Sequence, residues 1–318
     1  MVLAVSVDEV VWCYRTLLNR EPESEATVRE FVSSTRDFKV LVDRFIASEE
    51  YQQKCGTRGL VPLDRKDLEI EVKASASDLA RLKERIRATW TELGLSRPHY
   101  SVFSGDEYQP ALINDVSIEQ FYSSGVAEVE VIDAILRRYG FGASQANACL
   151  EYGCGLGRVT LALAKKFKKV RGYDISATHL EIAQQRAAAV GIKNVEFHLC
   201  SKDAVIDNLI GCDFFYSRIV FQHNPPPLMR LLITACLMAL RQGGIGIFQV
   251  PTYAPDYAFR VKDYLASPRS KEIEMHCLPQ AEVFNLIADA KCKPLEVTED
   301  GSVGHVGKWI SNTFVVRR

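Results

Sequence analysis

Hydrophobic positions along the second half of the chain follow two alternating patterns. Short runs of consecutive apolar residues are followed by stretches whose apolar positions recur every three or four residues. The first pattern predicts buried β-strands and the second predicts amphipathic helices. This alternation predicts an α/β fold with a mostly parallel sheet whose last strand is antiparallel. The expected strands occupy residues 148–150, 169–173, 195–200, 213–220, 245–250, 294–297 and 309–316.

The first part of the chain shows only helical periodicity. Residues 7–55 contain three short amphipathic stretches, with a turn at Asn-Arg-Glu-Pro over 19–22. Residues 56–76 are expected to form a connector, and a helix is expected from about Ser77 to Gly94. We therefore expect three parts: a small helical module at 1–56, a connector and lid-like helical segment at 57–116, and the α/β domain at 117–318.

The turn after the first strand carries three alternating glycines. Glu151 ends the strand, and Gly153, Gly155 and Gly157 follow at every second position. A side chain there would block the approach of a ligand to the backbone or forbid the required φ angle. The apolar stretch after the turn predicts a buried helix, whose free N–H groups and positive dipole end would favour a carboxylate or phosphate.

The second strand ends in an acid, Asp174, and Ser176 is the expected N-cap of the next helix. An acid at this position can accept hydrogen bonds from both hydroxyls of a ribose. The dinucleotide fingerprint G-x-G-x-x-G, counted from Gly153, would need a glycine where the chain has Arg158. Another interpretation of these residues is a glycine-tolerant turn in some other nucleotide-binding fold.

These segments resemble the class I S-adenosylmethionine-dependent methyltransferases, with EYGCGLG as their first motif and GYDIS as their second. The later segments DFFYSRIVFQHNPPP and LRQGGIGIFQVP resemble later motifs of the same family. The resemblance implies a Rossmann-like seven-stranded, mostly parallel sheet with helices on both faces, S-adenosylmethionine as the cofactor, and methyl transfer as the activity. It also implies that these residues contact the cofactor: Glu151, Gly153, Cys154, Gly155, Gly157, Asp174, Ile175, Ser201, Asp203 and Gln222.

The ends of the parallel strands are expected to meet at one edge of the sheet, where ligands bind in open α/β folds. If the methyl acceptor is a hydroxyl, a base must take its proton, and histidine suits that task near neutral pH. The candidates are His223, at the end of the fourth strand, and His276, in the segment after the fifth. The alternative for His223 is a structural role, capping the next helix or shaping the cofactor pocket.

The segment after the fifth strand is rich in tyrosine and too long for a plain connection, which predicts a binding or lid function. Tyr253, Tyr257 and Arg260 are candidate acceptor contacts, with packing or surface roles as the alternative. Asp256 and Glu274 could join His276 around a metal, but nothing in their spacing demands it, and we expect no metal.

Composition narrows the partners. The 318 residues are 47% hydrophobic and 25% charged, with a net charge of −1, which argues against nucleic acid and anionic membranes as partners. There is no apolar run of about 18 residues, and the start lacks a basic n-region, so we expect no membrane span and a cytoplasmic location. Nine scattered cysteines without a C-x-x-C pair predict free buried thiols.

The patterns YRTLLNREPE and LVDRFIASEEY resemble a small domain of bacterial proteins that often occurs beside enzymes of surface-glycan synthesis. That resemblance implies a scaffolding role, with docking of a protein partner. Two hypotheses result. The first is an enzyme that methylates a hydroxyl of a small molecule or glycan, and the alternative is a non-catalytic cofactor-binding or docking protein. The presence of Glu151 and Asp174 favours the enzyme.

Overall fold

The computed structural model describes residues 5–51, 66–143, 146–200, 209, 211–303 and 309–318. The chain divides into two compact units, of which one comprises residues 1–66 with 304–309 and the other residues 67–303 with 310–318. Each unit has its own hydrophobic core and is described by itself.

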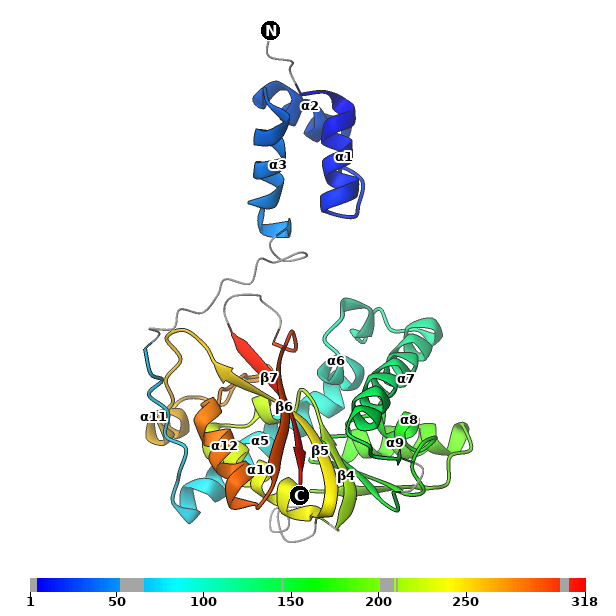
Figure 1. Cartoon of the computed structure of the whole chain (residues 1–318), viewed down its shortest axis with the longest axis vertical. Helices are drawn as coiled ribbons and strands as arrows, with labels where there is room; N and C mark the ends of the chain where they lie inside the picture. Colours follow the sequence, from blue (N-terminus) through cyan, green and yellow to red (C-terminus); the bar gives the residue numbers. More distant parts are fainter. Residues whose placement is uncertain (1–4, 52–65, 144–145, 201–208, 210, 304–308) are drawn as a thin grey trace. The chain divides into compact units, whose positions relative to one another are not determined.

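The described residues of the first unit form three short helices, as the sequence predicts (Figure 1). Tyr14 and Phe45 meet edge to face in its core, with ring centroids 4.9 Å apart. Each helix begins at a side chain that accepts a hydrogen bond from its first turn, which satisfies an otherwise unpaired N–H group. The helices and their N-caps are α1 (Val7–Leu17, Ser6), α2 (Glu25–Ser34, Ser24) and α3 (Phe38–Ile46, Asp37).

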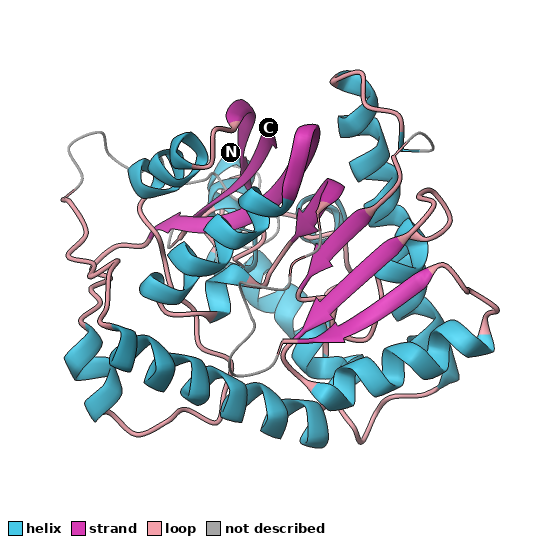
Figure 2. Cartoon of the chain, turned by 90° about the horizontal axis from the view of Figure 1, so that it is seen from below, coloured by secondary structure: helices cyan, strands magenta, loops and turns pink. Residues whose placement is uncertain are grey.

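The second unit is built on a seven-stranded sheet of order β3-β2-β1-β4-β5-β7-β6 (Figure 2). Strands β1 to β5 run parallel, and β7 is antiparallel to both β5 and β6, so the predicted sheet and its antiparallel last strand are confirmed. The strands are β1 (Cys149–Tyr152), β2 (Val170–Asp174), β3 (Val195–Leu199), β4 (Cys212–Ser217), β5 (Leu240–Tyr253), β6 (Lys293–Asp300) and β7 (Ile310–Arg317).

Helices cover both faces of the sheet (Figure 1). On one face α10 (Pro226–Ala239) and α12 (Gln280–Asp289) bury their apolar sides against β1, β4 and β5. On the other, α7 (Asp115–Arg138) and the short α8 (Thr160–Leu163) pack against the same strands. The remaining helices are α5 (Ala76–Ser96), α6 (Pro98–Val102), η1 (Asp106–Tyr108), α9 (Ala177–Ala189), η3 (Phe221–His223) and α11 (Val261–Ala266).

The helix after the glycine turn is much shorter than the sequence predicts. Only Thr160–Leu163 is α-helical, because the next backbone N–H groups of Lys165 and Lys166 bond three residues back and end the helix. The side chain of Asn194 then donates to the carbonyl oxygens of Ala164 and Phe167. A helix of four residues has little dipole, so the expected anion site at its N-terminus is not supported.

Gly94 does not end its helix, as the sequence suggested, because α5 continues to Ser96. A Cβ at Gly94 would lie 2.3 Å from Oγ of Ser176, the N-cap of α9. This glycine therefore allows α5 to cross closely over the beginning of α9. The fourth strand also ends earlier than predicted, at Ser217, and His223 belongs to the 3-10 turn that follows it.

Candidate active site

The glycine turn is held by its backbone conformation and by close packing. Gly153, Gly155 and Gly157 have φ angles of 77°, 51° and 78°, in the left-handed region where a side chain is strained. A Cβ on Gly153 would lie 2.3 Å from the side chain of Val220, and one on Gly155 would lie 2.8 Å from that of Val102 in α6. The helical segment that precedes the sheet therefore lies directly against the turn.

Asp174 connects the turn to the end of β2. Its two carboxylate oxygens accept hydrogen bonds from the backbone N–H groups of Gly155, at 2.8 Å, and Ser176, at 2.9 Å. The side chain is buried. A carboxylate has about four lone-pair positions, so two of them are left for hydroxyl groups of a ligand.

Glu151 and Cys154 are buried at the glycine turn. The carboxyl of Glu151 accepts a hydrogen bond from the hydroxyl of Thr160, and burial raises its pKa to about 8, so it is protonated near neutral pH. Burial also raises the pKa of the Cys154 thiol, which keeps it from acting as a thiolate nucleophile. Neither side chain presents a charge to a ligand, whereas the backbone of Cys154 belongs to the turn.

A cavity of about 1030 Å³ lies between α5, α10 and the strand ends. Tyr152 of β1, Ile175 after β2 and Cys200 after β3 line it. The volume is at the upper end of the range for ligand pockets, about 300–1,000 Å³. Apolar Ile175 suits the faces of a nucleoside base, which are largely apolar. The carboxylate of Asp174 next to it suits the two hydroxyls of the ribose. The residues present thus fit an adenosyl cofactor.

Three other expected cofactor contacts have a different outcome. Ser201 and Asp203 lie outside the described residues. Gln222 is buried, and its side-chain oxygen accepts a hydrogen bond from Nε2 of Gln249 at 3.0 Å. Gln249 also donates to Ser311 at 2.6 Å. The side chain of Gln222 is therefore engaged in fastening η3 to β5 and β7.

His223 presents one ring nitrogen as a proton acceptor. Its Nδ1 lies 2.9 Å from the backbone carbonyl oxygen of Glu274, which can only accept, so Nδ1 carries the proton and Nε2 has the lone pair. The ring packs against Trp90 of α5, with centroids 5.4 Å apart. Burial lowers the pKa of His223 to about 4, so the imidazole is neutral near pH 7.

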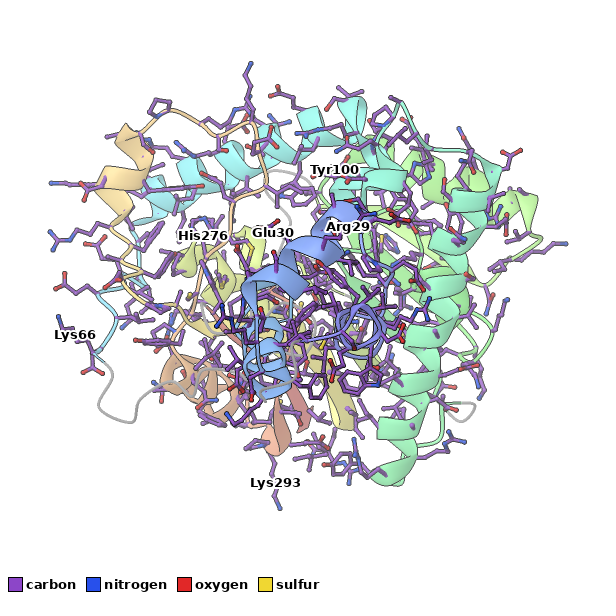
Figure 3. All side chains as sticks on the ribbon, turned by 90° about the horizontal axis from the view of Figure 1, so that it is seen from above. Arg29, Glu30, Lys66, Tyr100, His276 and Lys293 are labelled. Carbon is purple, nitrogen blue, oxygen red and sulfur yellow. The ribbon has the colours of Figure 1, made fainter. Side chains whose placement is uncertain are left out.

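His276, labelled in Figure 3, belongs to the segment between α11 and α12. Its backbone N–H donates to the carbonyl oxygen of Gln222 at 2.7 Å, which pairs the two histidine-bearing segments. The hydroxyl of Tyr257 lies 2.9 Å from its Nδ1. Burial, followed by the charges of His223 and Arg85, lowers the pKa of His276 to about 3.

The candidate acceptor contacts are separated by the structure. Tyr257 lies in the histidine cluster, whereas Arg260 is exposed and forms an ion pair with Glu69 at 3.2 Å. Tyr253 is half-buried at the end of β5. Arg260 is therefore better explained as a surface residue that holds the segment before α5.

The sequence did not identify three residues that complete the site. His179 of α9 is buried, and its Nε2 lies 3.0 Å from Oγ of Ser101 in α6. Trp90 packs against both His179 and His223. The place of Trp90 beside the histidines depends on contacts distant in sequence. In α6, the ring of Tyr100 (labelled in Figure 3) packs under the guanidinium of Arg97, which lies 5.5 Å from its centroid.

The described residues show no sign of a metal site or a membrane span. No group of three or more of their His, Cys, Asp or Glu side chains is arranged to hold a metal ion. Within the same part of the chain, no helix is long and apolar enough to cross a membrane. The eight described cysteines are all free and buried.

The sheet order, the glycine turn and Asp174 define the class I S-adenosylmethionine-dependent methyltransferase fold. Residues 149–244 match the family described as "Methyltransferase domain". The magnesium protoporphyrin IX methyltransferase (ChlM) from Synechocystis PCC 6803, solved with bound SAH, has a similar fold. Its TM-score is 0.52 at 17% identity, over 74% of this chain and 99% of that chain. The chain thus contains an S-adenosylmethionine-dependent methyltransferase domain.

Two curated relatives are more distant in coverage. A ubiquinone biosynthesis O-methyltransferase from Paracidovorax citrulli is 26% identical over 33% of this chain and 44% of its own length. An uncharacterized RNA methyltransferase from Halalkalibacterium halodurans is 24% identical over 51% of this chain and 35% of its own length. The chain therefore spans less than half the length of either relative, and the matches extend over the domain rather than the whole protein.

Proposed function

We propose that the protein transfers a methyl group from S-adenosylmethionine to a hydroxyl of a small molecule or glycan, with His223 as the base. The observation that carries the proposal is the fixed tautomer of His223, whose Nδ1–H is held by the carbonyl of Glu274. This leaves the lone pair of Nε2 to take a proton. The relative named as an O-methyltransferase supports a hydroxyl acceptor.

The chain supplies binding, orientation and exclusion of water. S-adenosylmethionine, when bound, supplies an electrophilic methyl group on a sulfonium sulfur and leaves as S-adenosylhomocysteine. The glycine turn, Asp174 and Ile175 hold the adenosyl part, and the cavity gives it room. His223 receives the hydroxyl proton at Nε2 as the oxygen is methylated. Trp90 covers His223 and keeps water away from it.

The pKa of His223 favours an acidic hydroxyl. A base whose conjugate acid has a pKa of about 4 differs by roughly 6 units from a phenol such as tyrosine, which corresponds to roughly 8 kcal/mol. The difference from a hydroxyl as weakly acidic as water is roughly 12 units, or about 16 kcal/mol. Phenolic and other acidic hydroxyls are therefore expected to react faster than those of a sugar.

We further propose that the N-terminal unit docks a protein partner. Trp12 and Phe38 are 47% and 40% exposed, and their ring centroids are 5.7 Å apart on the surface of that unit. Exposed aromatic residues of this kind are enriched where proteins bind one another. Together with the resemblance of this unit to a domain found beside glycan-synthesis enzymes, this supports glycan-linked acceptors as a second class.

Activity profiling with labelled S-adenosylmethionine tests the proposal. The full chain is incubated with four probe classes, namely phenols, carboxylic acids, nucleotide sugars and an RNA transcript, and transfer of label is measured by mass spectrometry. We expect methylation of an acidic hydroxyl, lost in His223→Gln, which keeps a donor for the carbonyl of Glu274. Label on RNA alone, or on no probe, would overturn the proposed acceptor class.

A further inference from the structure

The proposed function leaves one buried polar atom unexplained. Nε2 of His276 is buried and has no hydrogen-bond partner among the described residues, although the residue is only 6% exposed. Buried polar atoms are almost always paired, and an exception in a native fold calls for a ligand, a water or a functional reason. This atom lies in the half of the site where the methyl acceptor is expected.

The tautomer of His276 follows from its neighbours. The backbone N–H of Cys277 donates a hydrogen bond to the phenol oxygen of Tyr257. This bond lowers the pKa of Tyr257, but burial raises it by more. Since this oxygen accepts from Cys277, we infer that its own proton bonds Nδ1 of His276, 2.9 Å away. Nδ1 is then the acceptor and Nε2 carries the hydrogen. The unpaired atom is an N–H donor.

The surroundings of this donor contain no acceptor for it. Aromatic rings surround His276, with Tyr264 at 5.4 Å, Phe259 at 5.6 Å and Tyr257 at 6.3 Å between ring centroids. Arg85 stacks on the same Tyr264 ring at 4.2 Å, and its Nε is a second buried N–H donor without a partner in the described chain. The Glu274 carboxylate lies in the same cluster but accepts from the hydroxyl of Tyr264 at 2.6 Å and pairs with Arg85 at 3.9 Å. The two unpaired donors favour a ligand oxygen that accepts.

The contacts of the two histidines indicate how the Nε2 donor of His276 and the hydroxyl of the methyl acceptor come together. His276 donates its backbone N–H to the carbonyl oxygen of Gln222, and the ring of His223 donates to that of Glu274, so the two segments are tied together. The cavity that begins at the strand ends reaches Asn224 and Arg85, which adjoin this pair. One ring offers a lone pair at Nε2 and the other an N–H at Nε2. A hydroxyl, which donates and accepts, satisfies both.

We propose that His276 donates a hydrogen bond through Nε2 to the oxygen of the methyl acceptor, and that Tyr257 is the positioning residue that fixes this tautomer. The proposal rests on the proposed function for the identity of the acceptor. It assigns opposite roles to the two histidines, since His223 accepts the proton and His276 binds the oxygen. It predicts a preference for hydroxyl acceptors over amines, because a reacting amine needs its lone pair for the methyl group.

The first test reads the tautomer without any reaction. The full chain, labelled with ¹⁵N-histidine, is studied by long-range ¹H–¹⁵N correlation, and the signals of His276 are assigned by their loss in His276→Gln. We expect a protonated Nε2 and an unprotonated Nδ1. The pattern should persist in Tyr264→Phe, a matched control whose hydroxyl bonds Glu274 instead, and change in Tyr257→Phe. A bare Nε2 in the wild-type protein would overturn the proposal.

The second test asks whether an oxygen binds there. Phenol and benzene are titrated into the labelled protein saturated with S-adenosylhomocysteine. We expect phenol, and not benzene, to shift the Nε2–H signal of His276. An unchanged signal with phenol would contradict the proposal. This readout stands even if profiling finds no methylated product, so failure of the proposed function and failure of this inference can be told apart.

With an acceptor that is turned over, the variants give a kinetic readout. His276→Phe should lower kcat/KM about tenfold, equivalent to about 1.4 kcal/mol, with unchanged affinity for S-adenosylhomocysteine. His276→Gln places an amide N–H near the position of Nε2 and should restore activity to within a few-fold of wild type. Equal losses in both variants would indicate a packing role and overturn the assignment.

Discussion

The site has two halves, the cofactor half at the ends of β1 and β2 and the histidine half around His223 and His276. Their buried titratable groups are in opposite protonation states. At the ends of β1 and β2, burial raises the pKa of Glu151 to about 8, and the neutral form of this group is the protonated one. In the histidine half, burial lowers the pKa values of His223 and His276 to about 4 and 3, and the neutral form is the deprotonated one. The same desolvation thus keeps Glu151 and the two histidines uncharged near pH 7, but it makes them sensitive to opposite changes of pH.

The halves also differ in how they are assembled. Gly155 and Asp174 are 19 positions apart and meet across adjacent parallel strands. His223 and Glu274 are 51 positions apart and meet where the chain after β5 returns to η3. The cofactor half is therefore built from a local motif, and the acceptor half from distant parts of the chain. A change in one half is therefore expected to leave the other half intact.

The largest effect is expected from the base. His223→Gln should lower turnover by roughly a hundredfold to ten-thousandfold, because the hydroxyl proton then has no acceptor. Affinity for S-adenosylhomocysteine should stay near that of wild type, since the change lies outside the cofactor half. Initial rates and calorimetry on the same preparation measure both. A matching fall in cofactor affinity would support the alternative role of shaping the cofactor pocket.

Acid should destabilise the histidine half first. The unfolded chain takes up protons on both histidines as the pH falls below about 6.5, whereas the folded chain resists until about 4 and 3. The stability that they contribute is complete above pH 6.5 and is lost as the pH falls, by at most roughly 3–5 kcal/mol for each. Urea unfolding between pH 7.5 and 4 measures the slope, which should be smaller in His276→Phe. Equal slopes would show that His276 titrates normally.

Alkali should destabilise the cofactor half. The folded pKa of Glu151 is raised, so its contribution is complete below about 4.5 and is lost as the pH rises through about 8. Glu151→Gln keeps an oxygen for Thr160 and removes this titration. The variant is expected to be more stable than wild type at pH 8.5, by at most roughly 5 kcal/mol. The control is Glu181→Gln, an exposed residue of α9, which should leave stability unchanged. A destabilised Glu151→Gln protein would mean that the carboxylate form is required.

The smallest effect concerns the N-terminal unit. Its three helices have their own core, and the cavity, glycine turn and histidines all lie in the other unit. Deleting residues 1–66 should leave affinity for S-adenosylhomocysteine within error of the full chain. Calorimetry checks this, with circular dichroism to confirm folding. Aggregation or loss of binding would place the module within the catalytic fold.

The sequence predicted the strands, the glycine turn and the position of Asp174 well, because their signals are local. Glycines at alternate positions, an acid at the end of the next strand and alternating periodicities are visible without knowing the fold. Local propensity failed where tertiary contacts decide. Gly94 is a packing glycine under Ser176 rather than a helix end, and α8 is short because its chain tightens after Leu163. The pairing of His223 with Glu274, and the neighbourhood of His276, had no local signal.

The measurement that tests the central claim most directly is calorimetric titration of S-adenosylhomocysteine into the wild-type protein and Asp174→Ala, with NAD as the competing ligand. We expect the wild type to bind S-adenosylhomocysteine and not NAD. The variant should lose about ten- to a hundredfold in affinity, because charge-assisted hydrogen bonds of roughly 1.5–3 kcal/mol are removed. Binding of NAD without S-adenosylhomocysteine, or equal affinities in the two proteins, would contradict the assignment of the glycine turn and Asp174 as the cofactor site.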